Sequence, residues 1–151
     1  MSSESELDKM LEEIQKEFWA DYTETAINHA QHPRNVGSIP NADGFASVTG
    51  PCGDTMEIWL KVMGGKIKEA KFWTDGCGTT IAAGSMITEM VQGKGLAEAS
   101  KINQKDVLTA LGGLPEDSVH CALLAANTLK EAIKDYLAYK KEPWKRAYRK
   151  G

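Results

Sequence analysis

FASVTGPCGDTMEIWLKVMGGKIKEAKFW, residues 45–73, is the stretch that decides the fold. Three segments within it, 45–48, 56–62 and 67–73, alternate apolar residues with polar or small ones, which is the period-two pattern of β-strands. The pair Gly64-Gly65 separates the second segment from the third, and such a pair supplies the positive φ values of a two-residue hairpin turn. The stretch therefore predicts a three-stranded antiparallel sheet with one face in contact with solvent.

Two helices are expected before the sheet. Apolar residues recur at steps of three and four over residues 7–18, which indicates an amphipathic helix with Ser5 as its N-cap. A second helix is expected to start with Asp21 as its N-cap and to end just before Pro33, because proline disfavours helical geometry in the residue that precedes it. Residues 34–43 are then expected to form a loop.

Four helices are expected after the sheet, and a stripe of apolar residues marks the buried face of the last one. The first three should lie over residues 79–91, 96–100 and 104–111. The last begins after its N-cap Ser118 and ends at Pro143. Its predicted stripe consists of Val119, Leu123, Ala126, Leu129, Ile133 and Leu137.

This order of elements predicts an α+β fold in which helices pack on one face of the three-stranded antiparallel sheet. A length of 151 residues fits one domain, 1–151. Residues 1–20 would be an N-terminal helix of that domain, and residues 141–151 a basic tail. We interpret the tail as a solvated chain end, with docking to an acidic partner protein as the alternative.

Composition and charge narrow the classes of function. With 42% hydrophobic and 26% charged residues, the chain has the balance of a soluble globular protein. A formal net charge of -3 gives no basic surface for nucleic acid. No apolar stretch approaches the roughly 20 residues of a membrane span, and the acidic start does not resemble a signal peptide. We therefore expect a cytoplasmic protein with neither nucleic acid nor a membrane as its partner.

Three cysteines are an odd number for a disulfide framework, so reduced thiols are the better interpretation. Cys52 and Asp54 belong to the turn between the first two strands, where both side chains can face one pocket. Cys77 lies between glycines where the third strand gives way to a helix. His120 and Cys121 fall in the first turn of the final helix. A helix N-terminus lowers the pKa of a thiol, so we expect thiolates at Cys77 and Cys121.

If these element ends converge, they bring together three soft thiolates, one imidazole and one hard carboxylate. Three thiolates and an imidazole suit zinc or an iron-sulfur cluster. Asp54 adds a ligand that binds soft metals weakly, which suggests ligand exchange. Such a site could load and release its metal.

Other interpretations of these residues stay open. Free cysteines are often buried as small hydrophobic residues, and the chain lacks the C-x-x-C pairs typical of zinc sites, although glycines on both sides of Cys77 argue against a core position. A Cys-His hydrolase or acyltransferase is a further alternative. Against it, adjacent residues on a helix point in different directions, so His120 is poorly placed to activate Cys121. His29 and His32 have no thiol or carboxylate spaced with them, and we expect them to form ordinary hydrogen bonds.

A series of short motifs in this order resembles the IscU/NifU-type scaffold proteins of iron-sulfur cluster assembly, over about residues 21–137. The motifs are Tyr22 to His29, Pro33-Arg34-Asn35-Val36-Gly37, Cys52-Gly53-Asp54 with Met56, Gly76-Cys77-Gly78 through Ile81-Ala82 and Ser85, Thr88-Glu89, and Leu114-Pro115 with His120-Cys121. Each motif alone is weakly specific, whereas the whole series is highly specific.

The resemblance implies a non-enzymatic scaffold that builds a 2Fe-2S cluster from Fe²⁺ and sulfur and passes it to acceptor apoproteins. A cysteine desulfurase would supply the sulfur, an iron donor the iron, and a homodimer is compatible with the resemblance. The family ligands match Cys52, Cys77, Cys121 and His120, Asp54 matches the aspartate that keeps the cluster labile, and Cys121 would accept persulfide sulfur. Family members also bind Zn²⁺ at this site, so zinc in the resting or purified protein would agree with the resemblance.

One segment departs from the family pattern. Family members often carry Leu-Pro-Pro-Val-Lys before the His-Cys pair, which an Hsp70-type chaperone recognises, whereas this chain has Leu114-Pro115-Glu116-Asp117-Ser118. Acidic residues in place of apolar and basic ones argue against chaperone-driven transfer. The insertion associated with SufU-type zinc sulfurtransferases between the second and third cysteine segments is absent, so a zinc-dependent sulfur relay is the second choice.

Overall fold

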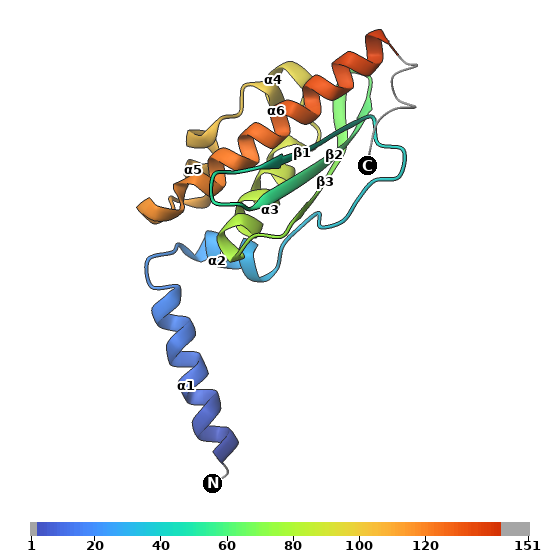
Figure 1. Cartoon of the computed structure of the whole chain (residues 1–151). Helices are drawn as coiled ribbons and strands as arrows, with labels where there is room; N and C mark the ends of the chain where they lie inside the picture. The colour runs from blue at the N-terminus through green and yellow to red at the C-terminus, as the bar shows by residue number, and fades with distance from the viewer. Residues whose placement is uncertain (1–2, 143–151) are drawn as a thin grey trace.

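The computed structural model of the chain describes residues 3–142. It confirms the α+β prediction: the helices α3 and α6 pack side by side on one face of a three-stranded antiparallel sheet (Figure 1). The elements are α1 (Ser3–Phe18), α2 (Glu24–Gln31), β1 (Gly44–Thr49), β2 (Thr55–Met63), β3 (Lys66–Thr74), α3 (Gly78–Val91), α4 (Leu96–Ser100), α5 (Gln104–Leu111), the 3₁₀ turn η1 (Glu116–Ser118) and α6 (Val119–Lys141).

The sheet has the order β1-β2-β3, and the alternation of side chains decides which face it buries. The side chains on the helix-covered face are buried, and they include Ala46, Met56, Ile58, Leu60 and Phe72. On the opposite face Trp59 pairs with Phe45 and Lys71, and all three are only half-buried. The hairpin between β2 and β3 turns on Gly64 and Gly65 with φ values of 61° and 75°, as predicted.

Helix α3 is the buried centre of the helical layer, with ten buried residues out of fourteen. It lies between β3, α2 and α6, so it has almost no polar face. Gly84 allows its close approach to the sheet, because a Cβ at this position would lie 2.4 Å from a ring atom of Phe72. The position of α3 matters for the site because the residues at its N-terminus carry candidate ligands.

The first two predicted N-caps are wrong. Helix α1 already begins at Ser3, so Ser5 lies within the helix. Helix α2 is capped by Thr23, whose hydroxyl oxygen accepts a hydrogen bond from the N–H of Ala26 at 3.0 Å, and not by Asp21. The Thr23 hydroxyl also donates to the carbonyl of Leu111 at the end of α5. This tertiary contact selects Thr23 as the cap, and local sequence preference could not reveal it.

The predicted contact face of α6 is wrong at both ends. Ser118 occupies the N-cap position, but its side chain makes no capping bond and lies 3.3 Å from the hydroxyl of Tyr22. Leu123 and Leu137, which we predicted to be buried, are 41% and 45% exposed. The middle of the predicted stripe, Ala126, Leu129 and Ile133, is buried as expected. Small residues complete the buried face, namely Cys121, Ala122, Ala125 and Ala132, together with Leu124 and Thr128. Small side chains let α6 lie close to β1.

Helix α1 extends away from the rest of the domain (Figure 1), and its apolar stripe remains in contact with solvent. Leu7, Met10, Leu11 and Ile14 are each at least half exposed. Among residues 3–142, no helix is long and apolar enough to cross a membrane. Of the predicted basic tail, 141–151, Lys141 is the last residue of α6, and residues 143–151, with Pro143, lie outside the described residues.

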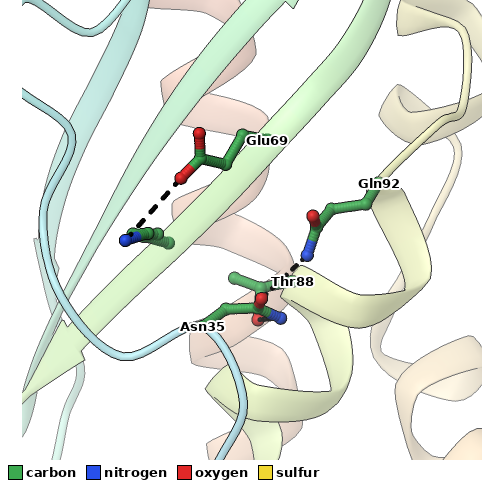
Figure 2. A network of polar contacts seen from close by, with 5 residues as sticks. Asn35, Glu69, Thr88 and Gln92 are labelled. Atoms are coloured by element: carbon green, nitrogen blue, oxygen red, sulfur yellow. Dashed lines mark hydrogen bonds and ion pairs between the residues drawn. The ribbon is translucent and has the colours of Figure 1, made fainter.

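The predicted loop over residues 34–43 runs along the free edge of β3 and is fastened there by Asn35. The backbone of Asn35 has a φ of 66°, and its carbonyl accepts the N–H of Phe72 at 2.9 Å. Figure 2 shows its side chain beside α3: the amide nitrogen donates to Thr88 at 3.2 Å, and the amide oxygen accepts from Gln92 at 2.9 Å. The loop therefore clamps the sheet edge to α3.

Candidate metal centre

Cys52 and Asp54 lie in a tight turn between β1 and β2. The N–H of Gly50 donates to the carbonyl of Asp54 at 2.8 Å, and the N–H of Gly53 donates to the carbonyl of Gly50 at 3.0 Å. Gly53 has a φ of 88°, which only glycine adopts without strain. The turn leaves Cys52 exposed and Asp54 half-buried, so the two side chains have different access to solvent.

Cys77 is the N-cap of α3, where the first-turn N–H groups of the helix have no partners within the helix. Burial alone would raise the pKa of its thiol. The backbone N–H groups and hydroxyls of Thr80 and Thr79 outweigh burial and hold the pKa below its usual value. The thiol is exposed and has increased thiolate character, as predicted from its place at a helix start.

Cys121 behaves in the opposite way, which corrects the prediction of a second thiolate. It lies in the first turn of α6 but is only 2% exposed. Burial raises the pKa of the Cys121 thiol, and the hydroxyl of Thr80 only partly opposes this. The negative charges of the neighbouring thiols and of Asp54 raise the pKa further. Burial of the Cys121 thiol therefore raises its pKa by more than the N-terminus of the helix lowers it.

His120 lies closer to Cys121 than its position as the adjacent residue on a helix led us to expect. Its Nε2 atom is 3.7 Å from the Cys121 sulfur. The geometric argument against contact between the two side chains was therefore wrong. The half-buried imidazole is close enough to the buried thiol for a weak N···S hydrogen bond.

Thr80 joins these elements, and the sequence analysis missed it. Its hydroxyl donates to Oδ2 of Asp54 at 3.1 Å and lies 3.4 Å from the sulfur of Cys121 and 3.9 Å from the sulfur of Cys77. The signal in the sequence was the spacing: residues i and i+3 share a helix face, so a hydroxyl three residues after Cys77 faces the same site.

The predicted residues lie together at the end of the sheet where β1 turns into β2. Cys52, Asp54, His120 and Cys121 line a cavity of about 120 Å³, together with Thr80 and apolar residues of β1 and α6. Cys77 reaches this group through Thr80. Within residues 3–142, no three histidine, cysteine or acidic side chains are already arranged to hold one metal ion. Ligation therefore requires movement, which the exposed turn carrying Cys52 can supply.

The donor chemistry of the group fits a soft metal. All three cysteines are free thiols, and soft thiolates select zinc or iron-sulfur clusters. His29, by contrast, lies away from this site: its Nδ1 is 2.7 Å from the hydroxyl of Ser85. Burial and the nearby Arg34 lower the pKa of His29. This histidine belongs to the packing of α2 on α3, as its lack of ligand partners predicted.

The sequence also matches a known family over most of its length. Residues 21–143 match the family described as "NifU-like N terminal domain". The Archaeoglobus fulgidus protein named iron-sulfur cluster assembly scaffold protein IscU 1 is 49% identical over 116 residues, which cover 76% of each chain. The Escherichia coli K12 protein named iron-sulfur cluster assembly scaffold protein IscU is 45% identical over 120 residues, covering 76% of this chain and 93% of the relative.

A solved structure supports the fold independently. The N-terminal part of a nitrogen-fixing NifU-like protein from Brucella abortus superposes with a TM-score of 0.62 over 80% of this chain and 97% of that chain. The two sequences are only 18% identical, so this likeness concerns the fold alone. The family match begins at residue 21, so α1 (Ser3–Phe18) lies outside it.

Proposed function

The chain belongs to the NifU-like N-terminal domain family, and we propose that it is a scaffold that assembles a labile 2Fe-2S cluster and hands it to acceptor apoproteins. The observation that carries this proposal is the grouping of two free thiols, a carboxylate and an imidazole around one cavity at the end of the sheet, with the third free thiol, Cys77, 3.9 Å from the Thr80 hydroxyl of that cavity. The names of the IscU relatives support it. Iron and sulfur are the substrates of this scaffold.

Cys52, Cys77, Cys121 and His120 are the proposed soft ligands, with Asp54 as the exchangeable one. Cys52 and Cys77 are exposed and open to an incoming ion, whereas Cys121 lies at the floor of the cavity. A hard carboxylate binds soft metals less firmly than a thiolate. Asp54 therefore offers a position at which the cluster can be attacked and released.

Sulfur would enter as a persulfide on a cysteine desulfurase, and we propose Cys121 as its acceptor. His120 takes the proton of the Cys121 thiol, over the 3.7 Å that separates the two atoms. The thiolate then attacks the terminal sulfur of the donor persulfide: a new S–S bond forms on Cys121, the old one breaks, and the donor leaves as a thiolate. Reduction of each transferred sulfur to sulfide takes two electrons, which ferrous iron and an external thiol or one-electron reductant supply.

The proposed partners follow from this chemistry. A cysteine desulfurase, an iron donor and acceptor apoproteins would meet the exposed end of the sheet. The acidic turn Glu116–Ser118 ends one residue short of the His-Cys pair and argues against the Hsp70-type chaperone. We propose a cytoplasmic location, because reduced thiols persist there. We also propose that the chain is a single domain. A homodimer remains compatible with the site, which has ligands open to solvent.

Anaerobic reconstitution tests the proposal. The metal-free protein would be incubated with ferrous iron, cysteine, a thiol reductant and a desulfurase, and absorption would be followed in the visible range. Sulfide-to-iron charge-transfer bands should appear in the wild type and disappear in Cys77→Ser, whereas Thr128→Val, about two helical turns after Cys121 in α6, should match the wild type. Absence of the bands in the metal-free wild type under these conditions would refute cluster assembly.

Zinc-loaded protein separates the scaffold from a zinc-dependent sulfur relay. With zinc left bound, mass spectrometry would measure the persulfide formed on each cysteine after treatment with the desulfurase. Repeated turnover of persulfide with zinc present and without any cluster would favour the relay. Labelling that survives in Cys121→Ser and is lost in Cys77→Ser would move the acceptor role to Cys77.

A further inference from the structure

Thr80 is a buried hydroxyl that contacts residues from all three segments of the candidate site. Its side chain is inaccessible to solvent, with 0% exposure. It reaches Asp54 of the β1–β2 turn at 3.1 Å, Cys121 of α6 at 3.4 Å and Cys77 of its own helix start at 3.9 Å. No other residue described here connects these three in this way.

The surroundings of Thr80 fix its position tightly. A Cβ on Gly76 would lie 2.7 Å from both Cβ and Oγ1 of Thr80 and 2.9 Å from its Cγ2. Only glycine therefore fits at position 76 while Thr80 keeps its place. The residue before Cys77 and the residue three positions after it are matched to each other in size.

The hydroxyl has one proton to give and two lone pairs to accept with. Its proton points to the carboxylate of Asp54 at 3.1 Å, and the sulfurs of Cys121 and Cys77 lie 3.4 and 3.9 Å from the same oxygen, where either partner can donate. Thiolates that hold a metal would only accept hydrogen bonds, so the carboxylate and the two thiolates would share the single proton of this hydroxyl. The hydroxyl is thus the group that holds the hard ligand beside the two soft ones.

We propose that Thr80 is a positioning residue that orients the carboxylate of Asp54 toward the sulfurs of Cys77 and Cys121 and so sets how firmly the site holds a soft metal. The inference rests on the proposed function, because it takes Asp54 and the thiols as ligands. Groups that orient metal ligands through hydrogen bonds typically change metal affinity by roughly 10- to 100-fold when they are removed.

The test is a double-mutant cycle between Thr80 and Asp54, read out by zinc. Thr80→Val keeps the shape of the side chain and removes the hydroxyl, whereas Thr80→Ser keeps the hydroxyl. Thr128→Val is the matched control, because Thr128 is equally buried and its hydroxyl bonds only to the carbonyl of Leu124 in its own helix. Zinc affinity would be measured by competition with a chromophoric chelator, and thermal unfolding of each metal-free variant would verify folding.

Zinc affinity should fall roughly tenfold in Thr80→Val and stay close to the wild-type value in Thr80→Ser and Thr128→Val. In an Asp54→Ala background, adding Thr80→Val should lower the zinc affinity by less than about twofold, because the carboxylate that Thr80 orients is gone. A Thr80→Val affinity equal to that of the wild type would overturn the inference. A full tenfold loss in the Asp54→Ala background would also overturn it, because Thr80 would then act through the thiols or through packing.

Measuring the cluster lifetime beside the zinc affinity distinguishes failure of this inference from failure of the scaffold proposal. If the wild type forms no cluster but the zinc cycle shows coupling, the scaffold proposal fails and the positioning role of Thr80 stands. If the wild type forms a cluster and Thr80→Val leaves both the zinc affinity and the cluster lifetime unchanged, the positioning role fails and the scaffold stands. Coupling in both measurements supports the two together.

Discussion

Substituting Gly84 with alanine should destabilise the protein through one contact, the packing of α3 against the ring of Phe72. The new Cβ would lie 2.4, 2.6 and 3.0 Å from three atoms of that ring, far inside the 3.5–4.0 Å of a favourable carbon contact. Phe72 is 1% exposed, so a shift of the ring must displace the residues that bury it. Overpacking of this kind costs about 3 kcal/mol at the upper end of its usual range.

The higher helix propensity of alanine offsets part of the loss in stability that overpacking causes. Alanine stabilises a helix interior by about 1 kcal/mol relative to glycine. The net loss in the free energy of unfolding should therefore be about 2 kcal/mol. In a domain of about 150 residues this corresponds to a melting temperature lower by roughly 4 to 8 °C.

The assay is thermal and urea unfolding of the metal-free protein, with Phe72→Ala as the second background. Removing the ring removes the clash, so Gly84→Ala should become stabilising there by about 0.5–1 kcal/mol. Phe72→Leu serves as the milder background if Phe72→Ala unfolds. An unchanged or higher melting temperature for Gly84→Ala alone would refute the reasoning, as would an equal penalty in both Phe72 backgrounds.

Three further outcomes are expected. Asp54→Ala should lengthen the lifetime of a reconstituted cluster in air or chelator by roughly tenfold, followed by its visible absorption; an unchanged or shorter lifetime contradicts the exchange role. Cys77 should react with iodoacetamide at lower pH than Cys121, because the pKa of Cys77 is lowered and that of Cys121 is raised by burial. Peptide mass spectrometry after alkylation from pH 6 to pH 9 would measure the two pH profiles. Equal profiles would contradict the prediction. Burial, and then the charge of Arg34, lowers the pKa of His29 in the folded protein. Below a pH of about 6.5 the unfolded chain therefore binds more protons than the folded protein. The free energy of unfolding should fall as the pH drops from there toward the folded pKa. His29→Gln should flatten that part of the curve of unfolding free energy against pH, and an equally steep curve would show that other groups cause the slope.

The sheet and most helices were predictable because their signals are local. Alternation of apolar residues set the three strands to within a residue or two, and the glycine pair at 64 and 65 set the hairpin. The boundaries of α4 and α5 also agree with the prediction. Local propensity failed where a distant partner decided the outcome, as when the contact of Thr23 with Leu111 selected the cap of α2.

The candidate site shows the same division. Residue type and glycine flanking were enough to single out the five proposed ligands and to predict the lowered pKa of Cys77. The raised pKa of Cys121 depends on its burial at the start of α6, and the apolar stripe predicted from periodicity did not include this residue. The approach of His120 to its neighbour depends on side-chain rotation, which sequence spacing does not describe.

By itself the sequence determined the α+β fold, the family and the identity of the thiols, carboxylate and imidazole, because strand period, turn chemistry and donor type are properties of short segments. The tertiary structure alone decided that these groups gather at one end of the sheet and that Thr80 lies between them. It also decided that one thiol is buried while two remain open to solvent. These features depend on how α3 and α6 pack on the sheet, and packing is a relation between segments far apart in the chain.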